Sequence, residues 1–251
     1  MMRDNVKQDN RRALPKYLLT ILLYGLLGGV LGFFTGVAGS VDVAERVRQT
    51  LNRVLEAAAP WGIVVSAVVL LGTGWYLYAA AKRRCDVWDG EDEDTIDDVE
   101  HQLGWALLLT GLMIVLDFFF FAASIIYGRF LPDLLLFLAS VVVLIVLQQK
   151  IVDLERRLNP EKRGSVYDMK FQKTWMDSCD EAERAQIGQA CYKAYMVGTK
   201  VCTFLWVALL ILNFVFDFGL LPIASVLVVW GVMQTVYALE CIRLGKRKEE
   251  A

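Results

Sequence analysis

Histidine is nearly absent from this sequence. The chain of 251 residues has one histidine, His101, and it contains neither an HExxH sequence nor a CxxC pair. Zinc sites and zinc proteases take several cysteine and histidine ligands at such spacings. We therefore predict no metal site and no cofactor.

Other catalytic arrangements are missing as well. No apolar stretch holds two carboxylates at catalytic spacing, and a serine or cysteine nucleophile would lack a base because His101 lies at the edge of an apolar stretch. We predict that the protein is not an enzyme and has no catalytic residues. A basic excess is also absent, since the formal net charge is −2, so we expect no nucleic-acid partner.

Apolar residues, in contrast, are abundant. Hydrophobic residues form 56% of the chain and the mean hydropathy is +0.44, which is too apolar for a soluble domain. Six stretches are apolar enough to be candidate membrane spans. They are residues 17–38, 61–81, 103–127, 134–147, 199–218 and 223–239.

Lysine and arginine are distributed unevenly between the connections. Of the 26 basic residues, 21 precede the first stretch or follow the second, fourth or sixth, and Lys200 lies at the adjoining end of the fifth, so 22 lie on one side of a six-pass chain. Basic loops stay in the cytoplasm. We therefore predict a multi-pass protein of the cell membrane with both termini in the cytoplasm. The five cysteines fall on this same side or at inner helix ends, where thiols stay reduced.

These patterns predict an all-α fold, a polytopic membrane helix bundle of six transmembrane helices arranged as three hairpins with cytoplasmic helical extensions. Pro60, Pro132 and Pro222 would each open the returning helix of a hairpin. The short fourth stretch reaches spanning length only if its helix begins at Pro132 and continues through residues 148–158. The expected organisation is a lead-in (1–16), four spans (17–147), a cytoplasmic helical connector (148–198), two spans (199–239) and a basic tail (240–251).

Glycine recurs along the first stretch at intervals of four residues. The predicted helix-packing face consists of Gly25, Gly28, Gly29, Gly32 and Gly36. Small residues at this spacing allow a second helix to approach closely. We expect contact with the second stretch, on the side of Gly62, Ser66 and Gly72, and a seam between two copies of the chain is the alternative.

Two connections carry further patterns. In the outer connection, residues 40–60, apolar residues recur every three or four positions, which predicts an amphipathic helix. It would lie on the surface, extend the second span or serve as a docking surface. In the inner connection, residues 85–102, the many carboxylates lack the ligand pattern of a calcium loop and indicate a solvated acidic face. Thr95 and Asp98 there resemble a capping box at the start of the third helix.

Two polar residues stand out within the apolar stretches. Asp117 lies well inside the third stretch, just before four phenylalanines. A carboxylate at this depth is costly and usually faces protein or water. Asp117 is therefore hydrogen-bonded within the bundle, reaches the outer headgroups or forms a cation or proton site. Asn213, in the fifth stretch, is the second candidate for an intramembrane polar site.

The connector carries a candidate cytoplasmic motif. Trp175 belongs to a basic and aromatic run. Asp180 and Glu183 fit a capping box, and Ser178 with Glu181 would form the same motif in another register. No proline separates the helix that starts here from the fifth span. We expect the two to form one continuous rod.

The connector and the lead-in resemble a known family. The residues that carry the likeness are NPEKRGSVYDMKFQKTWMDSCDEAERAQIGQACYKAY (159–195) and DNRRALPKYLL (9–19). They resemble the six-span membrane proteins of Gram-positive bacteria known as domain of unknown function three-one-six-nine. The resemblance implies a bacterial cytoplasmic-membrane protein of similar length and topology, and it supplies no activity and no catalytic residues.

Two hypotheses of function follow. The first is a non-catalytic membrane protein that works by interaction, as a sensor or accessory subunit, with the lipid bilayer and with a protein partner or a second copy of the chain. The second is a transporter or permease subunit that uses Asp117 for a cation, a proton or a solute.

The predicted topology has a direct test. Reporter tags inserted near Glu45 and near Asp168 should report opposite compartments, because three predicted spans separate the two positions. Paired fusions to an enzyme active only outside the cytoplasm and to a protein that fluoresces only inside it would measure this. Both tags in one compartment would contradict the six-pass topology.

Overall fold

The structure is a computed structural model that describes residues 14–19, 22–23, 25–26, 28–29, 41–88, 92–126 and 130–249. Every regular element in these residues is a helix, and they contain no strand, which confirms the all-α prediction. The chain divides into two compact units. One consists of residues 1–49 and 188–251, and the other of residues 50–187.

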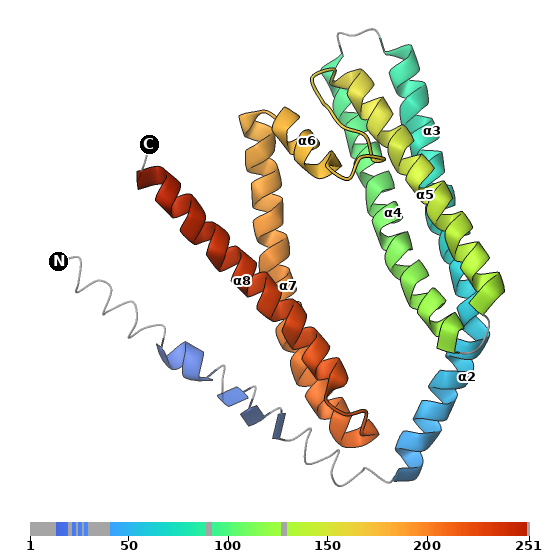
Figure 1. Ribbon diagram of the computed structural model, residues 1–251, viewed down its shortest axis with the longest axis vertical. Helices are drawn as coiled ribbons and strands as arrows, with labels where there is room; N and C mark the ends of the chain where they lie inside the picture. Colours follow the sequence, from blue (N-terminus) through green and yellow to red (C-terminus); the bar gives the residue numbers. More distant parts are fainter. Residues whose placement is uncertain are drawn as a thin grey trace. The chain divides into compact units, whose positions relative to one another are not determined.

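Long helices dominate both units (Figure 1). They are α2 (Val41–Ser66), the π-helix η1 (Ala67–Leu71), α3 (Gly72–Val87), α4 (Glu93–Ile126), α5 (Phe130–Leu158), α6 (Phe171–Ser178), α7 (Glu181–Phe216) and α8 (Leu221–Glu249). The fourth predicted span thus reaches its full length as expected, because α5 runs on to Leu158. The predicted rod is also confirmed, since α7 is one helix of 36 residues.

Five helices of the described residues are long and apolar enough to cross a membrane. They cover Trp61–Val87, Asp94–Ile126, Leu131–Leu158, Glu181–Asn213 and Leu221–Gly245, which correspond to the second to sixth predicted spans. The protein is therefore a multi-pass membrane protein. Most of the first predicted span, residues 17–38, lies outside the described residues, so the first predicted hairpin stays a prediction.

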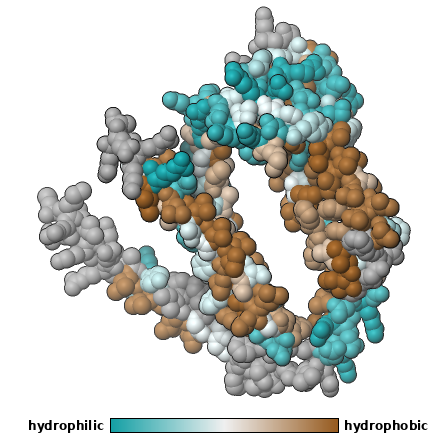
Figure 2. All heavy atoms as spheres, viewed as in Figure 1, coloured by the Kyte–Doolittle hydropathy of each residue, from teal (hydrophilic) through white to brown (hydrophobic). Residues whose placement is uncertain are grey.

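The core of the unit formed by residues 50–187 lies between α3, α4 and α5. Its buried side chains recur every three or four residues, so each helix turns one stripe toward its neighbours. On α4 and α5 they include Val99, Leu103, Ala106, Met113, Leu144, Leu147, Ile151 and Leu154. Figure 2 shows hydrophobic surface over the middle of these helices and hydrophilic surface at their upper end in the view, as expected of helices whose middle lies in a bilayer.

The outer connection is an extension of the second span. α2 continues without a break through η1 into α3, so the predicted amphipathic segment 40–60 and the span form one helical path. Pro60 lies inside α2, and the prediction that it opens the helix is wrong. The preceding residues 55–59, LEAAA, are strong helix formers, and their preference outweighs the one hydrogen bond that a proline removes.

The starts of the other helices follow the predictions in part. Pro132 and Pro222 lie in the first turns of α5 and α8. At α4, however, Asp92 takes the place of the predicted Thr95 and Asp98 capping box. Asp92 Oδ1 accepts a hydrogen bond from the backbone N–H of Asp94 at 3.2 Å, and Asp92 Oδ2 accepts one from Thr95 Oγ1 at 2.5 Å. Asp98 instead pairs with Arg84 of α3 at 2.5 Å, which turns its carboxylate away from the helix start.

In the other unit, α7 and α8 form a hairpin. The Tyr195 hydroxyl of α7 donates a hydrogen bond to Gln234 Oε1 of α8 at 2.7 Å, and the Tyr195 ring stacks on the Tyr237 ring with centroids 4.5 Å apart. The turn between the helices contains Asp217 and Gly219, with φ of 46° and 77°. Glycine and aspartate are among the residues that adopt this left-handed region most readily.

Gly62 provides a test of how closely α2 and α4 pack. A Cβ atom at Gly62 would overlap the ring of Phe120 on α4, whereas a Cβ atom at Gly111 would meet nothing within 4 Å. We expect Gly62→Ala to lower the free energy of unfolding by about 1–3 kcal/mol, as overpacking does. Gly111→Ala should leave it unchanged or raise it, because alanine favours helix. Thermal unfolding of both variants in a mild detergent measures the difference, and an unchanged Gly62→Ala protein would contradict the close packing.

Candidate functional site

Asp117 is fully buried between three helices. It lies on α4 with 0% exposure, between Ser66 at the end of α2 and Ser140 on α5. Ser66 Oγ lies 2.8 Å from Asp117 Oδ1, and Ser140 Oγ lies 2.5 Å from Asp117 Oδ2. Both carboxyl oxygens therefore have hydroxyl partners inside the bundle.

This environment agrees with the interpretation of Asp117 as a hydrogen-bonded residue of the bundle. Thr110, another polar residue of α4, is also engaged, since its hydroxyl accepts from Gln148 Nε2 at 3.1 Å. Within the described part of the chain, no group of three or more His, Cys, Asp or Glu side chains could hold a metal ion. No observation on these residues favours the transport hypothesis.

Asn213 lies on α7, in the unit formed by residues 1–49 and 188–251. Its Oδ1 atom is buried and has no hydrogen-bond partner among the described residues. Its backbone carbonyl accepts from the backbone N–H of Asp217 at 3.0 Å and so helps to end the helix. Asn213 and Asp117 are therefore features of different units.

The predicted glycine face is described at three of its five positions. A Cβ atom at Gly25, Gly28 or Gly29 would meet nothing within 4 Å, and Gly32 and Gly36 lie outside the described residues. The expected receiving side of α2 contacts α4, because Gly62 meets Phe120 and Ser66 meets Asp117. The helix that the glycine face contacts stays a prediction.

Residues 159–170, which join α5 to α6, are held on α5 by Gln149. This side chain is buried, and its Oε1 atom accepts hydrogen bonds from Ser165 Oγ at 2.9 Å and from the Val166 backbone N–H at 2.8 Å. Its Nε2 atom donates to Asp153 Oδ1 at 2.8 Å. One buried amide therefore fixes the path of the segment over α5.

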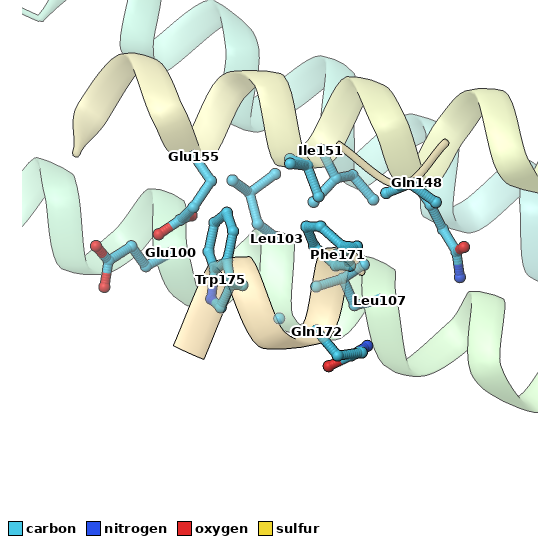
Figure 3. Close-up of a pocket in the computed structure, with 12 residues that line it drawn as sticks. Glu100, Leu103, Leu107, Gln148, Ile151, Glu155, Phe171, Gln172 and Trp175 are labelled. Atoms are coloured by element: carbon cyan, nitrogen blue, oxygen red, sulfur yellow. The ribbon is translucent and has the colours of Figure 1, made fainter. Parts of the chain in front are cut away.

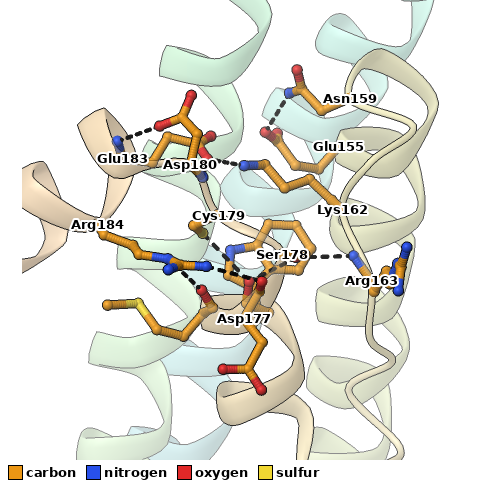
Figure 4. Close-up of polar contacts among 12 residues, drawn as sticks. Glu155, Asn159, Lys162, Arg163, Asp177, Ser178, Cys179, Asp180, Glu183 and Arg184 are labelled. Atoms are coloured by element: carbon orange, nitrogen blue, oxygen red, sulfur yellow. Dashed lines mark hydrogen bonds and ion pairs between the residues drawn. The ribbon is translucent and has the colours of Figure 1, made fainter.

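The same segment is tied to the start of α7 (Figure 4). The buried Lys162 donates to Glu183 Oε2, which also accepts from the Asp180 backbone N–H at 2.9 Å. Asp180 Oδ1 in turn accepts from the Glu183 backbone N–H at 2.8 Å, which completes the predicted capping box. Glu181 is exposed in the first turn of α7.

The ion pair keeps Lys162 charged despite its burial. Burial by itself lowers the pKa of Lys162, but the hydrogen bond to Glu183 and the surrounding negative charges outweigh it, so that the pKa of Lys162 is raised. The same bond lowers the pKa of Glu183, so the stabilisation is present at neutral pH and is lost as the pH rises through the pKa of Lys162 or falls through that of Glu183.

A cavity of about 510 Å³ lies between α6 and the adjoining ends of α4 and α5 (Figure 3). Trp175, the aromatic residue of the predicted motif, and Phe171 point from α6 toward α5. Leu103 of α4 and Ile151 of α5 form the apolar middle of the cavity. Its volume falls in the range of small-molecule sites.

One end of the cavity is electronegative. Glu100 of α4 and Glu155 of α5 line it, and Asn159 Nδ2 donates to the Oε1 atoms of these residues at 2.9 and 3.1 Å. The two carboxylates are thus within about 6 Å, where like charges disfavour each other. Among the described residues that line the cavity, none is a lysine or an arginine.

Sequence reasoning missed three residues that organise this region, Gln149, Asn159 and Lys162. Lys162 is one of ten basic residues between positions 148 and 200, and no local pattern separates it from the others. Asn159 lies four residues after Glu155, a spacing that predicts contact along a helix and could have revealed that pair. Its bond to Glu100, 59 residues away, has no such signal.

Replacing Lys162 tests the tie between residues 159–170 and α7. We expect Lys162→Met to lower the free energy of unfolding by about 1.5–3 kcal/mol, the usual contribution of a hydrogen bond to a charged group. Lys173→Met, which changes an exposed lysine of α6, is the matched control and should have little effect. Thermal unfolding followed by circular dichroism checks both, and equal unfolding temperatures would show that the ion pair does not hold the segment.

Comparison with known proteins places this architecture in a family. No curated protein and no solved structure matches the chain. The family described as "Protein of unknown function (DUF3169)" matches residues 11–240, a range that includes the connector and every residue of the cavity. The match confirms the family that the sequence resembles, without its six spans or its Gram-positive source, and the chain belongs to the DUF3169 family of proteins of unknown function.

Proposed function

We propose that this protein is a non-catalytic component of the cytoplasmic membrane that works by interaction, as a sensor or accessory subunit. Both termini would lie in the cytoplasm, as the distribution of basic residues predicts. The proposed partner is a protein or a second copy of the chain, and neither a cofactor nor a nucleic acid takes part. The proposed contact surface is the turn at residues 166–170 of the connector.

The observation that carries the proposal is the exposure of Tyr167 and Met169 in this turn. Tyr167 is 67% exposed and Met169 is fully exposed at 102%, in a turn that Gln149 holds against the side of α5. Tyrosine and methionine are enriched in protein interfaces. A contact made by these two side chains would bury apolar surface that is otherwise exposed on the protein.

The turn is held in one conformation. Gln149 binds the backbone N–H of Val166, and Asp168 Oδ1 accepts a hydrogen bond from the Lys170 backbone N–H at 2.9 Å. A segment that is ordered before it binds loses less conformational entropy on binding. This preorganisation supports a role in recognition.

The charges around the turn favour a protein partner over lipid headgroups. Asp168 and Lys170 are both exposed and flank Met169. Anionic headgroups attract surfaces of uniformly positive charge, whereas mixed charges beside apolar side chains are typical of protein interfaces. The helices would then lie in the bilayer, and the turn would contact a protein partner.

The segment of residues 159–170 is attached to two membrane helices, which links such a contact to the bilayer. Gln149 belongs to α5, and Glu183, the partner of Lys162, belongs to α7. Because α7 is a single helix from Glu181 to Phe216, a displacement at its first turn would be carried along it. Binding at the turn could thus bias the membrane helices between conformations, as a sensor or accessory subunit requires.

Photocrosslinking in cells tests this proposal. A photoreactive amino acid at position 169 of the full-length protein should give a discrete product with one protein or with a second copy, identified by mass spectrometry. Tyr167→Ser should reduce that product by about fivefold, because interface energy is concentrated in a few aromatic anchors. The same photoreactive residue at Lys173 serves as the control. A protein without a product at position 169, purified as a monomer in mild detergent, would refute the proposal.

A further inference from the structure

We propose that the cavity between α4, α5 and α6 binds an amphipathic organic cation. Its ammonium group would lie beside Glu155 and Glu100, and its apolar body would lie against Leu103, Ile151 and Phe171. The inference adds a small-molecule ligand to a protein proposed to act through protein contact. It holds whether or not the turn at residues 166–170 has a partner.

The charge of the cavity selects a cation. The carboxylates of Glu155 and Glu100 share the single amide donor of Asn159, and Lys162 of the adjoining segment is engaged with Glu183. A positive charge at this end would attract both carboxylates and offset their mutual repulsion. An anionic ligand would add to that repulsion.

The aromatic side chains favour an organic ammonium group. The Glu155 carboxylate and the ring of Trp175 line the same end of the cavity in the view of Figure 3. The rings of Trp175 and Phe171 lie with centroids 5.6 Å apart and planes tilted by 50°, so together they form an aromatic wall. A cation over the face of a tryptophan is attracted by the ring, and organic ammonium ions use this attraction in proteins.

An inorganic ion fits the same residues poorly. Divalent cations such as Ca²⁺ take six to eight oxygen ligands, and no group of three potential protein ligands of this kind occurs in the described residues. The remainder of the lining is largely apolar, with Leu103, Ile151 and Val152, and would have no role in holding a bare ion. The 510 Å³ of the cavity instead accommodates a ligand with an apolar body.

Fluorescence titration with dansylcadaverine, a primary ammonium with an aromatic body, tests the site. The full-length protein in an uncharged maltoside detergent should show a saturable rise in dansyl emission. N-acetyl dansylcadaverine has the same aromatic group without the charge. Its Kd should be at least about tenfold higher, because it lacks the attraction to the carboxylates and to Trp175. This comparison uses the unaltered protein and therefore does not depend on the folding of a variant.

Matched variants assign the binding to this cavity. Glu155→Gln keeps an oxygen acceptor for Asn159 but removes the charge, and it should raise the Kd of dansylcadaverine about tenfold. Glu161→Gln changes an exposed carboxylate that does not line the cavity and should leave the Kd unchanged. Trp175→Leu should raise the Kd several-fold, and circular dichroism with size-exclusion chromatography checks that each variant is folded.

Two results would overturn the inference. One is equal affinity of the unaltered protein for dansylcadaverine and its acetylated form, which would show that charge has no part in binding. The other is equal affinity of folded Glu155→Gln and Glu161→Gln for dansylcadaverine, which would place any binding elsewhere on the molecule.

Nanodiscs distinguish a soluble ammonium ligand from a lipid headgroup. If phosphatidylethanolamine occupies the site, its ammonium group should compete, and dansylcadaverine should bind more weakly than in nanodiscs of phosphatidylglycerol alone. Glu155→Gln should then remove that difference. If the ligand is a soluble cation, the Glu155-dependent affinity should be the same in both lipids.

Discussion

Water is absent from the hydrocarbon interior of a bilayer, and this constraint governs how α2, α4 and α5 meet. A carboxyl group such as Asp117 can be placed there only if the protein supplies its hydrogen-bond partners. Ser66 and Ser140 do so from two other helices, one for each carboxyl oxygen. The requirement of one buried side chain thereby brings three helices to a common point, and apolar residues such as Met113 and Leu147 fill the space along them.

Beyond the apolar part of these helices, hydrogen bonds from polar side chains fix the path of the chain. Gln149 binds the backbone of the segment that crosses it, and Lys162 joins that segment to Glu183 at the start of α7. Both side chains are buried, so each would be costly without its partners. This requirement explains why a segment of 12 residues without a regular helix, between α5 and α6, follows one path.

The cavity is a consequence of that path. The segment places α6 across the ends of α4 and α5, with Phe171 and Trp175 turned toward them (Figure 3). Carboxylates belong at the polar ends of membrane helices, where headgroups and water are near, and apolar residues belong further along. Where α6 covers this transition, the exposed Glu100 and the half-buried Glu155 line one cavity with the buried Leu103 and Ile151. The proposed ligand has the same division into a charged end and an apolar body.

Sequence by itself determined the membrane class, the positions of five described spans, the capping box of Asp180 and Glu183 and the unbroken α7. These features depend on hydrophobicity along one helix or on hydrogen bonds between residues three positions apart, so a local pattern suffices. Where two local preferences compete, the pattern misled. At Pro60 the helix formers before it prevailed, and at α4 Asp92 capped the helix while Asp98 turned to Arg84.

Only the tertiary structure decided what surrounds Asp117, which residues hold the connector and that a cavity exists. Ser66 and Ser140 lie 51 and 23 residues from Asp117 in the chain, and Glu100 lies 59 residues from Asn159. Serine, asparagine and lysine occur at many positions where they simply face water or headgroups. Which of them become partners depends on how whole helices pack, because packing alone brings distant side chains within hydrogen-bond distance.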